Sequence, residues 1–201
     1  MEENEDMSTT MDAAPARPAS ARQRLIEAAT ELFYGEGIHS VGVDRIIETA
    51  GVTRATMYKQ FAGKEGLVLA YLEGEDRGLR DLFAVAASAS DDPDVLLELV
   101  VEGISADIRD RHTRGCPFVN AAAEYPDGGP VRALIADHRE WFRSTLEQLA
   151  AGAGLREPAE VAASLVLLRD AALVGGYLDG QDRVAPAFAR TARGVIAGAR
   201  A

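Results

Sequence analysis

The sequence predicts an all-α protein of about nine helices, with no convincing strand. Glycine and alanine are plentiful while runs of β-branched residues are few and short, and this composition favours helices over sheets. Apolar residues also recur three and four positions apart along most of the chain, which is the spacing of one helix face. A chain of 201 residues can bury a real core in one or two domains.

Composition places the chain among soluble globular proteins. Hydrophobic residues make up 47% and charged residues 26%, which is ordinary for that class. A single cysteine excludes an intramolecular disulfide and suits a reducing compartment. No uninterrupted apolar run reaches the about 18 residues of a membrane span, because the longest, at 161–178, contains Arg169 and Asp170. The acidic, polar N-terminus is the reverse of a signal peptide. We therefore expect a cytoplasmic protein without a membrane partner.

The negative charge is unevenly distributed. The formal net charge is −11, of which residues 1–16 carry −5, residues 17–65 carry +1 and the remainder carries −7. Global acidity argues against nonspecific binding of polyanions. It does not exclude a local DNA-facing patch, because phosphate contacts act over about a Debye length, roughly 8–10 Å.

The first elements follow from caps and glycines. Residues 1–18 are acidic and polar with almost nothing to bury, and we expect them to be a disordered tail. Ser20 with Gln23 fits a capping box at the start of a helix, and Gly35 and Gly37 end its apolar pattern.

Two short helices follow around a glycine turn. Ile46, Ile47 and Ala50 form the apolar face of the first, which Gly51 ends, and Thr53 is well placed to cap the second. Two short helices joined in this way are the helix-turn-helix pattern.

The sequence predicts six further helices of different lengths in the rest of the chain. A long amphipathic helix begins near residue 62 with Leu67, Ala70, Tyr71, Leu79, Leu82 and Phe83 on its buried side, and Gly74 and Gly78 weaken it at a possible bend. Asp92 and Pro93 restart the chain as cap and first helical residue. Further helices are expected near 93–111, 117–125, 131–154, 157–180 and 183–200, with Pro186 near the start of the last.

Residues 22–69 resemble the N-terminal region of the TetR family of transcriptional repressors. The resemblance rests on the order and spacing of eight residues: Ile46, Ala50, Gly51, Val52, Tyr58, Phe61, Lys64 and Leu67. Gly42 departs from the family pattern, in which many members carry a capping Ser or Thr. The resemblance implies a helix-turn-helix DNA-binding domain at 19–65 and a helical ligand-binding and dimerisation domain at 66–201. It also implies a homodimer formed by the last two long helices.

The stretch GVTRATMYKQF, residues 51–61, is cationic and contains no acid. The N-terminal end of a recognition helix enters the major groove, so the exposed side chains here are candidates for DNA contacts. The resemblance adds backbone contacts for Tyr58 and Lys59 and a phosphate contact for Lys64. The candidates are Arg45, Thr53, Arg54, Ala55, Thr56, Tyr58, Lys59 and Lys64. The alternative for any one of them is the solvated face of a small helix.

The effector pocket that the resemblance implies is less well marked. Polar residues within apolar stretches need partners if they are buried, and a ligand is one such partner. The candidate ligand-binding residues are Phe118, Asn120, Glu124, His138, Trp141, Arg169 and Tyr177. Core packing is the alternative for each, and an intersubunit ion pair is the alternative for Arg169 and Asp170. The aromatic and apolar members suggest a lipophilic small molecule. The small residues Ala162, Ala163, Ala172, Gly175 and Gly176 suit close packing across a two-fold interface.

Cys116 has two interpretations. Nearby cations and a helix N-terminus suit a redox-sensing thiol, whereas a small packed residue beside a proline is the simpler interpretation. The scattered histidines His112 and His138 have no metal-ligand spacing, and nothing supplies an orienting group for a nucleophile. We expect no metal, no cofactor and no enzymatic activity.

The patterns predict an all-helical protein with a helix-turn-helix. The resemblance implies a ligand-responsive transcriptional repressor that binds a palindromic operator as a dimer and is released by a small molecule. The alternative is a helical small-molecule-binding protein or enzyme that does not bind DNA.

Overall fold

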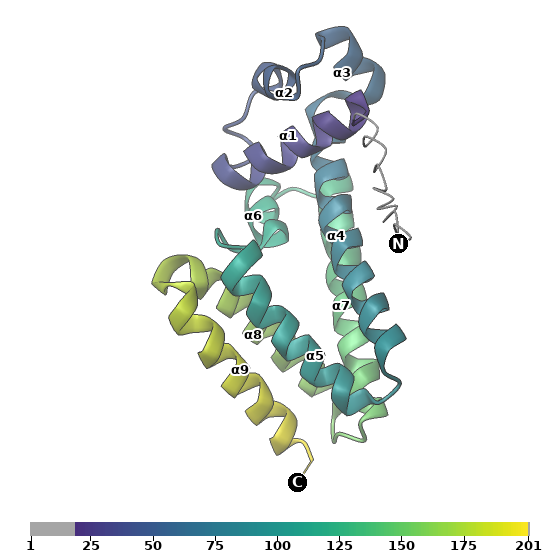
Figure 1. Ribbon diagram of the computed structural model, residues 1–201, viewed down its shortest axis with the longest axis vertical. Coiled ribbons are helices and arrows are strands. Elements are labelled where there is room, and N and C mark those ends of the chain that lie inside the picture. The colour runs from purple at the N-terminus through teal and green to yellow at the C-terminus, as the bar shows by residue number, and fades with distance from the viewer. Residues whose placement is uncertain (1–18, 201) are drawn as a thin grey trace, which may run out of the picture.

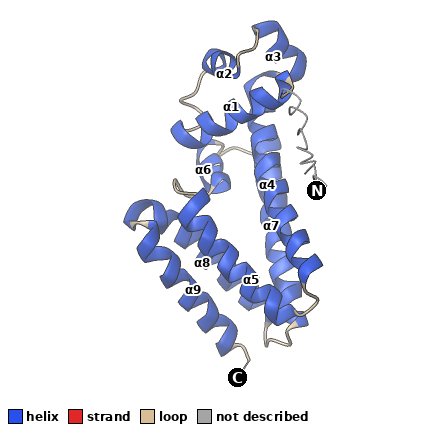
Figure 2. Ribbon diagram, in the orientation of Figure 1, coloured by secondary structure: helices blue, strands red, loops and turns tan. Residues whose placement is uncertain are grey.

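The computed structural model describes residues 19–200, and these residues form nine α-helices, one π-helical turn and no strand. The predicted tail at 1–18 lies outside the described residues. Figure 1 shows α1 to α3 gathered at one end of an elongated molecule, and Figure 2 shows that only helices and loops join them to the rest. The elements are α1 Ala21–Glu36, α2 Val43–Ala50, α3 Arg54–Gln60, α4 Gly63–Ala89, α5 Pro93–Ala106, the π-helical η1 Asp107–Arg111, α6 Pro117–Glu124, α7 Pro130–Gly152, α8 Pro158–Asp179 and α9 Gln181–Gly198.

Helices α1 and α3 begin where the caps predict. The side chain of Ser20 accepts the Gln23 N–H and that of Thr53 accepts the Thr56 N–H, so both N-caps are confirmed. Only half of the capping box forms, because the Gln23 side chain turns to Glu27 instead. Gly51 ends α2 with a left-handed φ of 60°, a conformation that glycine adopts without steric cost.

Helix α4 joins the two ends of the molecule without a break. Neither Gly74 nor Gly78 ends it. A Cβ at Gly78 would lie 3.2 Å from a nitrogen of the Arg111 guanidinium, so the glycine gives room for a side chain from η1. Leu82 was placed on the buried side by its spacing, and that prediction is wrong: its side chain is 58% exposed. The reason is that the C-terminal half of α4 faces a cavity and not a closed core.

Helix α8 packs between α7 and α9. Its small residues Ala162, Ala172 and Gly176 are buried within this one chain. A Cβ at Gly176 would meet Ile108 at 2.9 Å, so this glycine admits a side chain of η1 and not a helix of a second subunit. The prediction that these three residues serve a two-fold interface is therefore corrected to packing inside the protomer.

The opposite face of α8 is apolar and uncovered in this chain. Leu167 and Leu178 are 68% and 70% exposed, and Val174 and Tyr177 lie with them at 40% and 51%. By length and mean hydropathy α8 also meets the criteria for a membrane span, although Arg169 and Asp170 lie in its middle. Core helices of soluble proteins meet the same criteria, and α8 packs on both of its neighbours.

The last helix begins earlier than its proline suggested. Helix α9 starts at Gln181, so Pro186 lies inside the helix and not at its start. Proline lacks an N–H and therefore leaves one carbonyl of the preceding turn without its helical partner. Ala185, Phe188 and Ala192 are buried on the same helix, so packing holds the segment helical despite that loss.

Candidate nucleic-acid interface and ligand cavity

Helix α3 presents an exposed polar face at the end of the molecule. Met57 is fully buried beneath it, while Arg54, Ala55, Tyr58 and Lys59 are exposed on its outer side. The packing of Met57 therefore orients the short helix. Its exposed side can enter a groove while the core contacts of Met57 remain.

The cap of α3 also organises two hydroxyl groups. The Oγ1 atoms of Thr53 and Thr56 lie 2.8 Å apart, and the Thr56 N–H donates to Thr53 Oγ1 over 3.2 Å. These groups stand at the positive end of the helix dipole, where anions are favoured. The arrangement suits a phosphate oxygen, although a helix this short does not make a site without the neighbouring cations.

Two arginines near α3 form ion pairs with exposed acidic residues. Arg54 is paired with Asp44, and Arg45 is paired with Glu36, both across exposed side chains. Exposed pairs of this kind contribute only about 0–1 kcal/mol, so a phosphate can compete for either arginine.

Lys64 lies in the first turn of α4. Its Nζ is 3.5 Å from the His39 carbonyl oxygen, and burial lowers the pKa of its ammonium group. The eight predicted DNA-contact residues thus come from α2, the turn before α3, α3 itself and the first turn of α4. These elements lie together at one end of the molecule in Figure 1.

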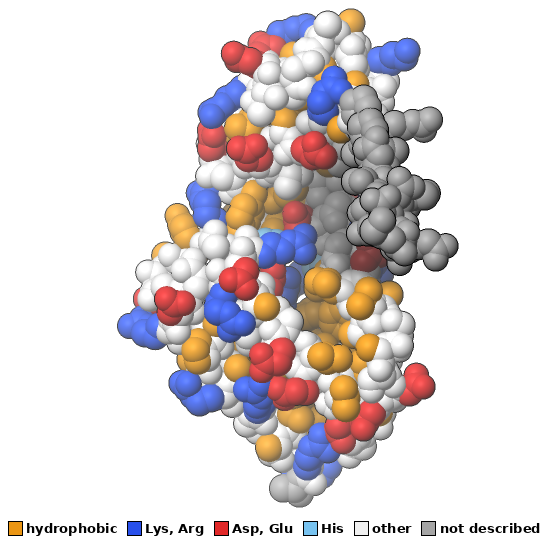
Figure 3. Space-filling model, in the orientation of Figure 1, with side chains coloured by type: hydrophobic (Ala, Val, Ile, Leu, Met, Phe, Trp, Pro, Cys, Tyr) orange, Lys and Arg blue, Asp and Glu red, His pale blue; other side chains and the backbone are white. Residues whose placement is uncertain are grey.

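A separate cavity of about 340 Å³ opens between α4 and α5, with α6, α7 and α8 closing its far side. This is at the lower end of the volumes of small-molecule sites, about 300–1,000 Å³. Figure 3 shows hydrophobic side chains gathered around a hollow in this part of the surface. The uncharged lining residues are Leu79, Leu82, Phe83, Ala86, Leu99, Val100, Gly103, Ile104, Ala106, Phe118 and Phe142.

Arg169 brings a charge to this apolar lining, and its side chain is only 5% exposed. Its Cζ lies 5.0 Å from the centre of the Phe142 ring, and its Nη1 lies 3.9 Å from Cys116 Sγ. The nearest carboxylate oxygen, Asp170 Oδ1, is 3.8 Å away, while Asp170 Oδ2 is paired with Arg139 at 2.8 Å. The expected intersubunit ion pair is therefore corrected: Asp170 pairs with Arg139 of its own chain, and Arg169 is buried within the protomer with Asp170 as its nearest, more distant carboxylate.

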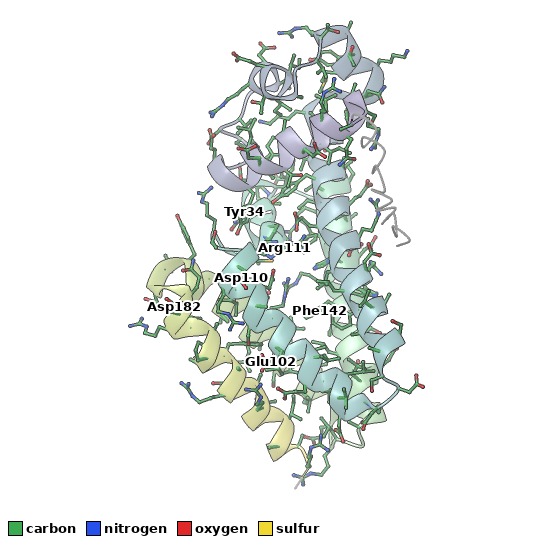
Figure 4. The ribbon with its side chains drawn as sticks, in the orientation of Figure 1. Tyr34, Glu102, Asp110, Arg111, Phe142 and Asp182 are labelled. Carbon is green, nitrogen blue, oxygen red and sulfur yellow. The ribbon has the colours of Figure 1, made fainter. Side chains whose placement is uncertain are left out.

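A cluster of charged residues borders the cavity at η1. His112 is nearly buried, with Nε2 3.1 Å from Glu75 Oε2 and Nδ1 2.7 Å from Asp107 Oδ1. Burial alone lowers the pKa of an imidazole, but these two carboxylates together raise the pKa of His112. Arg111 pairs with the same Glu75 at 2.9 Å. Figure 4 shows Arg111 and Asp110 at the end of α5 that lies toward Tyr34. A π-helical turn such as η1 is frequent at functional sites.

His138 lies behind the cavity wall. Its ring stacks on that of Phe118 with the centroids 3.6 Å apart, and its Nδ1 is 2.8 Å from Asp76 Oδ1. Its Nε2 is buried and has no hydrogen-bond partner among the described residues. Burial, together with the charges of Arg169 and Arg80, lowers the pKa of His138, so this ring loses its proton at a lower pH than His112 does.

Of the seven predicted ligand-binding residues, Phe118 and Arg169 line the cavity. His138 supports Phe118 from behind, and Trp141 lies over Arg80, 5.5 Å from Phe83 and outside the cavity lining. Asn120 is exposed and donates to the Arg114 carbonyl, and Tyr177 is on the outer face of α8. The cluster of Glu75, Arg111 and His112 was missed. The available signal was Glu75 beside Asp76 in the middle of an otherwise apolar helix face.

Glu124 joins the two ends of the molecule. Its carboxylate accepts the backbone N–H groups of Ile38 at 2.8 Å and His39 at 2.5 Å, and it also contacts His39 Nδ1 at 3.1 Å. Gly37 has a φ of 92°, and a Cβ there would lie 3.5 Å from the carboxylate. That distance is an ordinary contact, so it is the positive φ, which side-chain-bearing residues rarely adopt, that calls for glycine where the chain turns toward Glu124.

A second connection passes through Tyr34 at the end of α1. Its hydroxyl donates to the Gly115 carbonyl and accepts the Arg114 N–H at 2.7 Å, and burial raises the pKa of this phenol to about 12. The Tyr34 ring also lies edge-on to the His112 ring, with the centroids 5.8 Å apart. Because His112 borders the cavity, one side chain separates that cavity from α1.

Cys116 is buried with 1% of its surface exposed. This agrees with the simpler of its two interpretations, a small packed residue. His112, Glu75 and Asp107 do not converge as metal ligands, since the two carboxylates lie on opposite nitrogens of the ring. Across residues 19–200 no group of three such side chains could hold an ion.

Comparison with known proteins gives consistent results. Residues 25–71 match the family model described as bacterial regulatory proteins, tetR family. The solved structure of SCO4454, a TetR-family transcriptional regulator from Streptomyces coelicolor, is 41% identical in sequence. The similarity covers 91% of each chain with a TM-score of 0.85.

The curated relatives match over shorter lengths. The regulator LmrA of Bacillus subtilis is 29% identical over 118 residues, which are 58% of this chain and 56% of LmrA. SrpR of Pseudomonas putida is 38% identical over 64 residues, 32% of this chain and 30% of SrpR. The chain therefore spans about half or less of these two relatives, whereas the similarity to the solved structure covers 91% of the chain.

Proposed function

This chain belongs to the TetR family of bacterial transcriptional regulators, and we propose that it is a ligand-responsive repressor that binds a palindromic operator as a homodimer. Members of this family are regulators and not enzymes, which confirms the expectation that the chain has no enzymatic activity. A small molecule in the cavity between α4 and α5 would release the protein from DNA. Because its target is DNA, we also propose a cytoplasmic location.

The observation that carries DNA binding is the exposed face of α3. Arg54, Thr56 and Lys59 lie on this helix. Met57 is its one buried side chain and anchors it to the core. Arginine can pair with guanine in the major groove, and the threonine and lysine side chains can donate to phosphates. Lys64 and Arg45 would add phosphate contacts on either side.

The apolar face of α8 supports a dimer. Leu167, Val174 and Leu178 are large, exposed and on one face of a helix whose other face is buried in the protomer. A two-fold axis through this face would bury the same patch on both subunits. The two copies of α3 would then reach successive major grooves, about 34–36 Å apart along the DNA.

Release would follow from the connections between the two ends. Helix α4 lines the cavity with Leu79 and Phe83 and continues into the DNA-binding end. Moving α4 away from α5 would stress the hydrogen bonds of Tyr34 and Glu124. A ligand that binds better to the displaced state would shift the population toward it, and DNA would do the opposite.

A gel shift with DNA from upstream of the gene tests this proposal. We expect a salt-dependent shift at a palindrome and a dimer in sedimentation, and a reporter under that promoter should rise when the gene is deleted. A chain that shifts no DNA at low salt, or a reporter that falls on deletion, contradicts repression.

A further inference from the structure

The cavity combines apolar walls with one deeply buried cation. Leu79, Phe83, Val100 and Ile104 form walls on α4 and α5, and Arg169 reaches the lining from α8 on the far side. In Figure 4, Phe142 lies in the space between α5 and the paired helices α4 and α7. Since the Arg169 guanidinium lies against this ring, the charge stands at the inner end of the cavity.

The other charges that border the cavity are already balanced. Glu75 faces Arg111 and His112, and Asp107 faces His112 from the other side. Asp110 is exposed, so a cation paired with it would stay in water. A cation entering the cavity would find no buried carboxylate free of a partner among these groups.

Arg169 is in the opposite situation. Asp170 is its nearest carboxylate, and that carboxylate is shared with Arg139, to which it is closer by 1.0 Å. Two arginines against one aspartate leave an excess of one positive charge. Among the described residues, Arg169 donates only a long hydrogen bond to the weak sulfur acceptor Cys116 Sγ at 3.9 Å, and Asp170 Oδ1, at 3.8 Å, is beyond hydrogen-bond distance. Burial of a charge without a close partner is costly.

We propose that the effector is an amphipathic carboxylic acid whose carboxylate accepts hydrogen bonds from the buried Arg169 guanidinium while its apolar tail lies between α4 and α5. This rests on the proposed function, in which the cavity holds the effector. A guanidinium and a carboxylate match as a bidentate pair, and water-free surroundings strengthen it. A phosphate dianion would require more donors than this single arginine supplies.

Three eight-carbon compounds with different head groups test the proposal: octanoate, octanol and octylammonium. Trp141 is the single tryptophan of the chain and lies 5.5 Å from Phe83 of the lining, so its fluorescence can report filling. We expect octanoate to bind at least tenfold more tightly than octanol, and octylammonium to bind most weakly.

Variants separate the charge from the shape of the site. Arg169→Met keeps most of the length of the side chain, and it should weaken octanoate at least tenfold while leaving octanol unchanged. Arg169→Lys should keep most of the preference for octanoate. Arg156→Met removes an exposed arginine beyond the end of α7 and should change nothing. Circular dichroism checks that Arg169→Met is folded. If it is not, the affinity order of the three compounds, measured on the unaltered protein and on Arg169→Lys, tests the proposal.

Each contrary result overturns a different statement. Equal binding of octanol and octanoate, tighter binding of octylammonium, or unchanged octanoate binding by Arg169→Met refutes the carboxylate. Failure of all three compounds to bind, while the operator shift persists, refutes both this ligand class and the cavity as their site but leaves DNA binding in place. Loss of the operator shift in the unaltered protein refutes the proposed function, whatever the compounds do.

Discussion

The α3 surface and the cavity use charge in opposite ways. On the α3 surface, Arg54 and Arg45 form ion pairs with exposed acidic residues, and each can exchange that acid for a DNA phosphate. Around the cavity, His112 and Arg169 are buried, and their contacts hold helices from distant parts of the chain together. Charge at the first place can therefore be changed with little effect on stability, whereas charge at the second is bound up with the fold.

The difference separates two classes of experiment. Substitutions on the α3 surface should alter affinity for DNA while the melting temperature stays the same. Substitutions near the cavity or at its connections should alter stability and release together. A substitution that mixes these effects shows where the separation fails.

The largest effect is expected from Arg54→Ala combined with Lys64→Ala. One good arginine contact to a base contributes about 1–3 kcal/mol of discrimination, and a phosphate contact adds a salt-dependent term. The double variant should lose at least about 100-fold in operator affinity at 0.15 M salt, because 1.4 kcal/mol corresponds to a factor of ten. Fluorescence anisotropy with labelled operator DNA measures this loss.

A charge-matched control is available on the distant helices. Arg156→Ala with Arg190→Ala removes the same two charges from exposed positions near α8 and on α9. Beyond a Debye length of roughly 8 Å their effect is screened, so affinity should hold within about threefold. An equal loss in both double variants would show that net charge, and not the α3 face, governs binding.

The two regions also differ in how far the sequence predicts them. The α3 surface lies within one short segment, so the spacing of Val52, Met57 and Phe61 is enough to separate its buried side from its exposed one. The cavity wall is assembled from five helices and a π-helical turn. Leu82 was assigned to the core because a helix facing a cavity has the same apolar period as a helix facing a core.

Arg169 and Glu124 illustrate the same limit. Both were picked out as polar residues that require partners, but the sequence does not say which partner each one meets. Arg169 lines the cavity, while Glu124 meets backbone N–H groups more than 80 residues away in the chain. Such pairings depend on the packing of whole helices, and local patterns do not contain that information.

The next effect concerns the connection made by Glu124. Glu124→Ala leaves the N–H groups of Ile38 and His39 without their acceptor, which costs about 1–3 kcal/mol when such groups are partly buried. At about 2–4 °C per kcal/mol for a chain of this size, the melting temperature should fall by about 2–12 °C. Thermal unfolding followed by circular dichroism gives the value.

Two further variants define this connection. Glu124→Gln keeps one acceptor oxygen and should lose less. Glu140→Ala removes a glutamate from the exposed surface of α7 and should not shift the melting temperature. If Glu124→Ala also behaves like the surface variant, the loop between α1 and α2 does not depend on α6.

The two buried histidines should give opposite pH dependences of stability. The folded pKa of His112 is raised by Asp107 and Glu75 against the effect of burial, so its contribution is fully present below the unfolded pKa of about 6.5 and is lost as pH rises through the folded value. The folded pKa of His138 is lowered, mainly by burial, so its contribution is present above about 6.5 and is lost as pH falls toward the folded value.

Melting temperatures of His112→Asn and His138→Gln from pH 5 to pH 8.5 test these signs. His112→Asn should flatten the decline above pH 6.5, and His138→Gln should flatten the decline below it. Comparison of slopes makes the result independent of any constant loss of stability. If His112→Asn alters only the acidic side, its proton is not held by the two carboxylates.

The smallest effect tests whether the α3 cations are truly free to exchange partners. Asp44→Asn removes the acid paired with Arg54, and the pair joins two exposed side chains. Such a pair is worth about 0.2–1 kcal/mol, so releasing Arg54 should tighten operator binding by up to about fivefold, with a loss of stability of no more than about 1 kcal/mol. Glu48→Gln is the matched control, since it removes one exposed acid from the same helix but has no ion pair among the described residues. If both variants tighten binding equally, Asp44 acts only through its negative charge near the phosphates. If Asp44→Asn weakens binding, the ion pair orients Arg54 for the groove. The exposed Arg54 would then depend on its partner as closely as the buried His112 does.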